Sequence, residues 1–187
     1  MKYIVCFLLL TFVLVACTSK QKDGVYIGQK INDFIAYVQP PYEVKKEIMQ
    51  MEGDDYDIYN VYENGEKIYS VEPDFDKPNI VWRIWIYSPK FKTEEGIGVG
   101  STFADIKSKY HVKFISTEGE GGLQVDVKES SIGIIMDNSK LPKGWWVKAD
   151  TNEIPDSLPI EEIILTDKED YIKSDFSIIT NRQSDKK

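Results

Sequence analysis

Hydrophobic and polar residues alternate along most of the chain from Tyr42 onward, with the two-residue period of strands that bury one face. Asn64-Gly65 separates two such segments rich in tyrosine and valine. Because both residues of the tightest hairpin turns need a positive φ, this dipeptide predicts a β-hairpin. The predicted strands cover residues 42–51, 56–63, 67–71, 79–88, 111–116, 123–128, 131–137 and 160–166, after a short extended entry at 25–27.

The segment 79–88, NIVWRIWIYS, is the most apolar of the predicted strands. Strict alternation places Ile80, Trp82, Ile84 and Ile86 on one face, and Val81, Arg83, Trp85 and Tyr87 on the other. Both faces are largely apolar. We therefore expect this strand to lie at the centre of its sheet.

Two segments have the helical period instead. In residues 30–39 the apolar positions are Ile31, Phe34, Ile35 and Val38, which share one helical face. Proline at 40 and 41 ends this helix, because proline lacks an amide donor and constrains the residue before it. The second helix follows Thr102, and its apolar face is Phe103, Ile106 and Tyr110. Thr102 and Asp105 are spaced for a capping box.

These two helices start alike. The segment IGQKINDF at 27–34 aligns with VGSTFADI at 99–106, which pairs Gly28 with Gly100 and Asp33 with Asp105. In both cases the segment begins a predicted helix, and predicted strands come after it. The repeat predicts an α+β fold of two tandem half-domains, each a short helix packed on an antiparallel β-meander. The halves are 25–92 and 93–170, and 171–187 is a C-terminal tail, partly disordered. A chance match over so short a segment is the alternative.

The N-terminus carries a localisation signal. Residues 1–16 are a nearly continuous apolar run after Lys2, and Leu14-Val15-Ala16-Cys17 resembles the lipobox of bacterial lipoproteins. The resemblance implies a signal peptide at 1–16, palmitate or a related lipid on Cys17 that anchors the chain to a membrane, and a polar tether at 17–24. Thr18 in place of aspartate favours the outer membrane, at its periplasmic or surface face. An ordinary signal peptide with Cys17 a free thiol is the alternative.

Charge, cysteine content and histidine content exclude several classes of partner and of catalytic site. The formal net charge is −8, which disfavours nucleic acid and anionic lipid headgroups as partners. Cys6 lies in the predicted signal and Cys17 is the predicted lipid site, so the expected folded part has no disulfide. His111 is the sole histidine, and catalytic triads and most zinc sites need a histidine with partners. The sequence therefore favours a non-enzymatic protein and predicts no cofactor.

Two further segments are weak candidates for binding an ion. The run GIGVGS at 96–101 departs from the dinucleotide pattern at Ser101 and lacks the Gly-Lys-Ser/Thr of phosphate loops. A turn and a helix cap explain its glycines, although free amides at Gly100, Ser101 and Thr102 would form an anion site. The acidic turn at 52–57 lacks the spacing of a calcium loop, so we predict no metal site, with a weak calcium contact left open.

Trp145-Trp146 is the candidate binding feature of a proline-bearing insertion at 138–159. If one indole packs in the core and the other faces solvent, the exposed indole can contact a protein or a glycan.

The segment 88–105, SPKFKTEEGIGVGSTFAD, resembles small exported lipoproteins of Bacteroidetes-type bacteria that have no assigned function. That resemblance implies an exported α+β domain and supplies no catalytic residues. The glycine-then-helix start is also similar, at the level of fold plan, to outer-membrane assembly lipoproteins and β-lactamase-inhibitor proteins. The resulting hypothesis is a lipid-anchored envelope protein that binds another protein or an envelope assembly. The alternative is a glycan-binding or glycan-processing accessory protein that uses exposed aromatic residues.

Overall fold

A wide antiparallel sheet dominates the computed structural model, which describes residues 23–180 except 52, 120–121 and 149. Within those residues it has eight strands in the order β2-β3-β4-β5-β10-β9-β8-β7. Their bounds are β2 Tyr42–Met51, β3 Asp54–Glu63, β4 Glu66–Pro73, β5 Val81–Ile86, β7 Val112–Gly119, β8 Gly122–Val127, β9 Gly133–Met136 and β10 Ile160–Leu165. The architecture is α+β with a strong β component.

A second, four-stranded sheet has the order β1-β11-β12-β6, and its last pair is parallel. Its strands are short: β1 Gly24–Tyr26, β6 Lys92–Thr93, β11 Tyr171–Lys173 and β12 Ser177–Ile179. Residues 171–179 therefore belong to the fold, whereas the sequence assigned them to a tail. The extended entry predicted at 25–27 corresponds to β1, within one residue. Two or three residues are too few to show an alternating pattern, which is why β6, β11 and β12 escaped prediction. The predicted disorder of the final residues, 181–187, falls outside the described residues.

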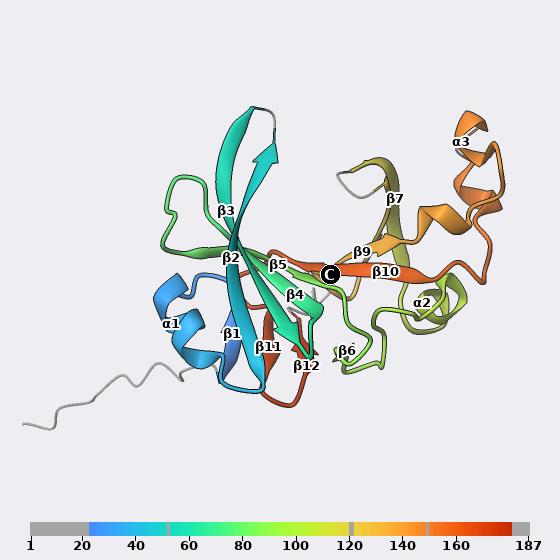
Figure 1. Ribbon diagram of the computed structural model, residues 1–187. Helices are drawn as coiled ribbons and strands as arrows, with labels where there is room; N and C mark the ends of the chain where they lie inside the picture. The colour runs from blue at the N-terminus through green and yellow to red at the C-terminus, as the bar shows by residue number, and fades with distance from the viewer. Residues whose placement is uncertain (1–22, 52, 120–121, 149, 181–187) are drawn as a thin grey trace, which may run out of the picture.

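Helices α1 and α2 and the small sheet lie on the same side of the large sheet (Figure 1). Helix α1 spans Ile31–Tyr37 and α2 spans Phe103–Lys109, both inside the predicted segments. The predicted insertion holds α3, Trp145–Lys148, between two 3-10 turns at Asn138–Lys140 and Thr151–Glu153.

The main core lies between these layers. Phe34 of α1 and Ile106 of α2 are fully buried, each against the large sheet. The Phe34 ring meets Tyr59 and Tyr69 edge-on, with 6.4 Å between ring centroids in each pair. The other face of the large sheet has a smaller cluster of Trp85, Ile135 and Ile164 at its middle. We call this side of the large sheet the open face. In Figure 1 the β2–β3 hairpin and β7 rise from it on either side of β5 and β10.

Two sequence predictions about the strands are confirmed. Strand β5 lies in the interior of the large sheet, between β4 and β10. The hairpin turn forms at Asn64 and Gly65, whose φ angles are 52° and 84°, as this turn requires.

The predicted face assignment of β5 is wrong at its first residues. Val81 packs in the main core, and Trp82 is half exposed. The cause is a bulge: Arg83 pairs with Glu72 and Val81 pairs with Pro73, so Trp82 has no cross-strand partner. An extra residue shifts the alternation by one, and from Arg83 onward the predicted faces hold.

Among the described residues, no helix has the length and apolarity needed to cross a bilayer. The predicted signal peptide and Cys17 fall outside the residues that the structure describes.

The predicted capping box at the start of α2 is confirmed. The Thr102 hydroxyl accepts a bond from the Asp105 amide at 3.2 Å, and an Asp105 carboxylate oxygen accepts from the Thr102 amide at 2.8 Å. The Thr102 hydroxyl also donates to the same carboxylate oxygen at 2.8 Å. The bond from the Thr102 amide, and after it this hydroxyl bond, lower the pKa of Asp105. The reciprocal pair fixes where α2 begins.

Replacing Thr102 with alanine should lower the free energy of unfolding by about 0.5–2 kcal/mol, because the Asp105 amide loses its acceptor. Urea unfolding measures the change. Thr102→Ser keeps the hydroxyl and should unfold close to the unsubstituted protein. An equal loss in both variants would contradict the capping role.

Candidate functional site

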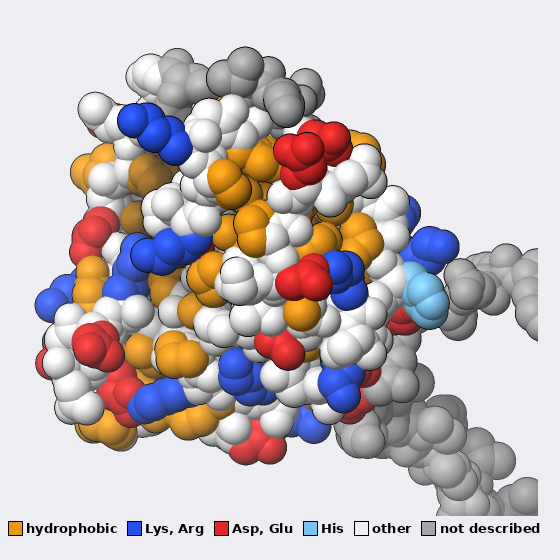
Figure 2. All heavy atoms as spheres, turned by 90° about the vertical axis from the view of Figure 1, so that its right-hand side faces the viewer, with side chains coloured by type: hydrophobic (Ala, Val, Ile, Leu, Met, Phe, Trp, Pro, Cys, Tyr) orange, Lys and Arg blue, Asp and Glu red, His pale blue; other side chains and the backbone are white. Residues whose placement is uncertain are grey.

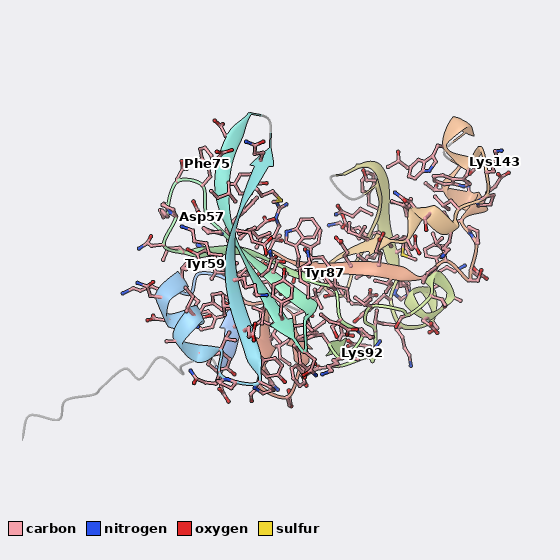
Figure 3. All side chains as sticks on the ribbon, viewed as in Figure 1. Asp57, Tyr59, Phe75, Tyr87, Lys92 and Lys143 are labelled. Carbon is pink, nitrogen blue, oxygen red and sulfur yellow. The ribbon has the colours of Figure 1, made fainter. Side chains whose placement is uncertain are left out.

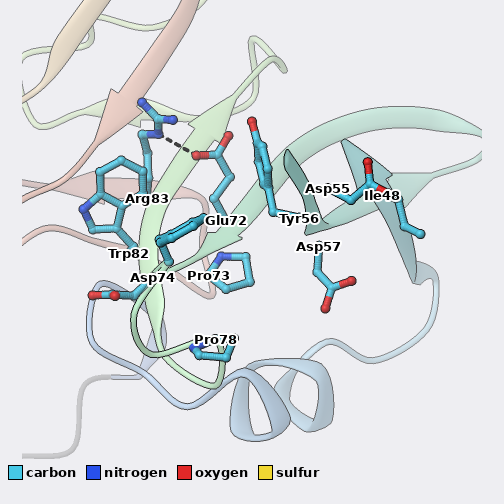
Figure 4. Close-up of a pocket in the computed structure, with 11 residues that line it drawn as sticks. Ile48, Asp55, Tyr56, Asp57, Glu72, Pro73, Asp74, Pro78, Trp82 and Arg83 are labelled. Atoms are coloured by element: carbon cyan, nitrogen blue, oxygen red, sulfur yellow. Dashed lines mark hydrogen bonds and ion pairs between the residues drawn. The ribbon is translucent and has the colours of Figure 1, made fainter. Parts of the chain in front are cut away.

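An apolar cleft lies at the margin of the large sheet, between the β2–β3 hairpin and the loop that joins β4 to β5 (Figure 4). Its volume is about 440 Å³, within the range of small-ligand sites. Of the six large hydrophobic side chains exposed in the described chain, three line this cleft. They are Ile48, Phe75 and Trp82, which are 70%, 78% and 45% exposed. Surface apolar groups gathered in this way mark an interaction site more often than isolated ones do.

Each of these side chains is held by a different element. Ile48 is on β2, opposite Asp57 of β3, in the part of the hairpin that extends past the core. Phe75 is on the β4–β5 loop. Asp74 fixes that loop, because its Oδ1 accepts from the amides of Asp76 at 2.9 Å and Lys77 at 3.0 Å. Figure 3 shows Phe75 beside the β2–β3 hairpin that carries Asp57, and both residues lie far from Lys143. The β5 bulge turns Trp82 toward the same cleft.

A nearly buried ion pair forms the inner end of the cleft. Arg83 Nε donates to Glu72 Oε2 at 2.6 Å, and Trp85 Nε1 donates to Glu72 Oε1 at 2.8 Å. The side chains of Glu72 and Arg83 are only 3% and 12% exposed. The guanidinium carbon also lies 4.4 Å from the ring centroid of Trp82 and 4.8 Å from that of Trp85. Arg83 therefore joins the cleft to the small cluster on the open face.

The cleft is acidic as well as apolar. Its lining includes the carboxylates of Asp55, Asp57, Glu72 and Asp74, against the single guanidinium of Arg83. Asp55 accepts from Gln50 Nε2 at 2.8 Å, and Asp57 is 2.9 Å from Lys46 Nζ. The hydrogen bond to Asp57 is the main cause of a raised pKa at Lys46. The cleft therefore presents hydrogen-bond acceptors around an apolar floor.

A second, polar hollow of about 390 Å³ lies on the open face and shares Arg83 with the cleft. Lys113, Gln124 and Asp126 contribute to it from β7 and β8. Near the middle of the same face, burial is the main cause that raises the pKa of Tyr87 to about 12. Tyr87 is therefore neutral at neutral pH, and the Lys67 ammonium lies 4.1 Å from its ring centroid.

The predicted tryptophan pair is divided between core and surface. Trp145 is 5% exposed and packs in the main core, whereas Trp146 is 43% exposed. Their rings meet edge-on with 5.0 Å between centroids. Buried Trp145 Nε1 has no hydrogen-bond partner among the described residues. Only Trp146 can offer its ring to a ligand. Figure 2 shows the side that carries α2 and α3, where hydrophobic groups are interspersed with charged ones.

The anion site proposed at the start of α2 is wrong. Every amide from Gly100 to Asp105 donates within the chain. The acceptors in order are Ile160 O, Gly98 O, Asp105 Oδ2, Leu158 O, Asp156 O and Thr102 Oγ1. The Asp105 carboxylate already occupies the place that an external anion would take.

Of the other sequence candidates, the acidic turn contributes to the cleft, whereas His111 lies elsewhere and Cys17 falls outside the described residues. His111 is exposed, and its Nδ1 lies 2.5 Å from Glu129. Part of the acidic turn contributes Asp55 and Asp57 to the cleft. In the described ranges, no three His, Cys, Asp or Glu residues are grouped so as to hold a metal ion. Cys17 falls before the first described residue.

Sequence reasoning missed the cleft because its parts are far apart in the chain. One local signal was available: Phe75 stands between two aspartates in the loop sequence PDFDKP. A large aromatic residue in a polar turn has no core to enter, so it marks exposed apolar surface. Nothing local indicated that Ile48 and Trp82 would lie beside it.

The fold and the cleft define an α+β protein built on a wide antiparallel sheet, with a candidate binding site at the sheet margin. No family model and no curated protein sequence matches the chain. Among solved structures, the chain is similar to the uncharacterized protein yfeY from Escherichia coli, with a TM-score of 0.57 and 15% sequence identity. The similarity covers 78% of this chain and 97% of that one. At this identity the likeness shows the fold alone.

Replacing Arg83 with methionine should lower the free energy of unfolding by about 3–5 kcal/mol, because Glu72 then stays buried without this cation. Chemical denaturation measures the loss. The double variant Glu72→Gln/Arg83→Met removes both charges and should be more stable than Arg83→Met alone. A double variant that is no more stable than Arg83→Met would show that the charge pairing is not the cause.

Proposed function

We infer that this chain is a non-enzymatic, lipid-anchored protein of the cell envelope that binds a protein partner through the apolar cleft. The cleft carries the inference: Ile48, Phe75 and Trp82 converge there from three elements and stay exposed. Apolar surface left in water is costly, and a partner that covers it recovers this free energy.

The chemistry of the cleft supports a contact surface. Its carboxylates have structural partners, since Asp74 holds the loop, Asp57 pairs with Lys46, and Asp55 accepts from Gln50. Glu72 is engaged by Arg83 and by Trp85. Carboxylates with such partners fix the shape of the surface that a partner protein would contact. A general acid or base instead needs a proton that it can exchange with a bound substrate.

The proposal includes two tandem α+β halves, residues 25–92 and 93–170. The strand order supports it: β2 to β5 run inward from one edge of the sheet, and β7 to β10 run inward from the other. Each set follows a short helix. Two copies of one unit, placed edge to edge by pairing their last strands, would produce this order.

Matching hydrogen bonds at the two helix starts give further support. In both, a positive-φ glycine and the residue three positions later donate to the segment that leads into the last strand of the half. The bonds are Gly28 N to Val81 O (2.8 Å), Ile31 N to Asn79 O (2.9 Å), Gly100 N to Ile160 O (2.9 Å) and Phe103 N to Leu158 O (2.8 Å). Unrelated segments have no reason to share this arrangement, so we favour a repeat over chance.

The anchor rests on the sequence Leu14-Val15-Ala16-Cys17. A lipid on Cys17 and the polar tether that follows would hold the folded part next to a membrane, with the outer membrane favoured by Thr18. The cleft would then face partners in the periplasm or at the cell surface.

Glycan binding is the second candidate, and half-exposed Trp146 is the observation that favours it. Sugars stack on exposed indoles in the way that other apolar faces do. Trp146 on α3 has an edge-on neighbour in Trp145 that fixes its ring.

Replacing Cys17 with serine should move the protein from the membrane fraction to the soluble fraction, because serine has no thiol to carry the lipid. Fractionation of cells, with blotting for the protein, measures the change. The thermal unfolding of the folded part should stay the same. Retention of Cys17→Ser in the membrane fraction would contradict the lipid anchor.

A photo-reactive benzoylphenylalanine at position 75 should crosslink a discrete partner protein in intact cells, because Phe75 faces the cleft. Trp146 is an exposed aromatic residue on α3, away from the cleft, and the same probe there is the matched control. Adding Trp82→Ala should abolish the adduct at position 75. Equal adducts at both positions, or none at 75, would refute binding at the cleft.

A further inference from the structure

We propose that the cleft takes an extended protein segment with an apolar anchor side chain flanked by lysine or arginine. The identification of this ligand class rests on the proposed function, because it assumes that the occupant is a protein. This ligand class follows from the size of the cleft, its hydrogen-bonding groups, its charge and the second hollow beside it.

The cleft has room for one or two apolar side chains. Its 440 Å³ is bounded by Ile48, Phe75 and Trp82, with Pro73 and Pro78 as further apolar walls. Figure 4 shows these prolines on the opposite side from Arg83 and Tyr56. Proline has no amide hydrogen, so the two prolines offer no donor to a ligand.

The remaining polar groups are mostly acceptors. Asp55, Asp57 and Asp74 place carboxylates at the rim. The strongest donor in the lining, Arg83, is committed to Glu72 and lies against two indole rings. Carboxylates accept hydrogen bonds and repel other anions. A matching ligand therefore supplies donors, and a positive charge makes each of those bonds stronger.

The net charge of the chain also favours a positively charged ligand. At −8, the protein as a whole attracts cationic segments and repels acidic ones. In the lining, Arg83 offsets the charge of Glu72 and Lys46 offsets that of Asp57, so Asp55 and Asp74 leave the rim negative. An acidic glycan, a phosphate group or an acidic peptide would meet repulsion at the rim.

The cleft also continues beyond Arg83. The polar hollow on the open face includes Arg83 in its own lining, so the two hollows lie on either side of one side chain. A compact small molecule would fill only one of them. An extended chain that places its anchor in the cleft can continue over Arg83 toward Lys113, Gln124 and Asp126, whose charges are mixed. The basic flanks are therefore assigned from the carboxylates at the rim of the cleft. We therefore identify the occupant as a polymer segment with basic flanks.

Fluorescein-labelled peptides of three compositions test the proposal with the detergent-solubilised full chain. The peptide Lys-Lys-Phe-Leu-Lys-Lys should bind about tenfold more tightly than Glu-Glu-Phe-Leu-Glu-Glu and than Lys-Lys-Gly-Ser-Lys-Lys. Fluorescence anisotropy measures each affinity. The preference for the lysine-flanked apolar peptide should shrink as salt increases, because the rim charges are exposed and screened.

Variants separate the two contributions. Trp82→Ala should weaken the apolar lysine peptide severalfold at every salt concentration. Asp55→Asn with Asp57→Asn should weaken it severalfold only at low salt. Glu153→Gln with Trp146→Ala changes two exposed residues outside both hollows and should alter its affinity far less. Unfolding curves for each variant separate lost binding from lost structure.

Three results would overturn the proposal. They are equal affinity for the glutamate-flanked peptide, insensitivity to the Asp55 and Asp57 changes, and Trp82-dependent binding of a neutral oligosaccharide in place of the lysine peptide. If the probe at Phe75 still crosslinks a partner, protein binding at the cleft stands and only the basic-segment assignment fails. If that probe crosslinks nothing, the proposed function fails with it.

Discussion

The pairing of β5 with β10 is the interaction on which the rest of the structure depends. Ile86 faces Ile163 and Ile84 faces Leu165 on the core side, while Trp85 faces Ile164 on the open side. Both faces of this pair are apolar and buried, so the two strands are stabilised from both sides. Without it the large sheet would separate into two four-stranded sheets, each with an apolar edge strand exposed to pairing with other chains.

The cleft follows from how β5 enters this pair. The bulge at Trp82 adds one residue at the start of the strand, which turns Trp82 outward and leaves Arg83 facing Glu72 on β4. A buried ion pair contributes little net stability, because desolvation offsets the attraction. The pair nevertheless constrains how β4 and β5 align, because a shifted register between them would bury Glu72 without Arg83. We therefore regard the pair as a register constraint that also positions one wall of the cleft.

Features set by neighbouring residues could be predicted from the sequence. The Asn64-Gly65 turn, the Thr102 cap and the interior position of β5 each follow from a few adjacent side chains. The pairing of the small sheet could not be predicted, because β6 and β12 are two and three residues long and lie far apart in the sequence. The cleft is likewise non-local. Ile48 and Phe75 read as an ordinary strand residue and a loop residue until the hairpin and the loop are placed together. The proposed anion site failed because Asp156 and Leu158, distant in sequence, supply acceptors to the α2 amides.

The proposed lipid anchor and the proposed binding at the cleft also fit each other energetically. Burying three half-exposed or exposed apolar side chains contributes about 4–9 kcal/mol before costs. Association alone costs an estimated 4–15 kcal/mol, so the cleft by itself gives weak binding that a few charge-assisted hydrogen bonds at the rim would strengthen only modestly. A tether changes this balance, because two partners held at one membrane meet at an effective concentration that can reach about millimolar. Weak recognition of a short basic segment is then sufficient, and it remains readily reversible. A cleft of this size and charge is therefore better suited to a membrane-held protein than to one diffusing freely.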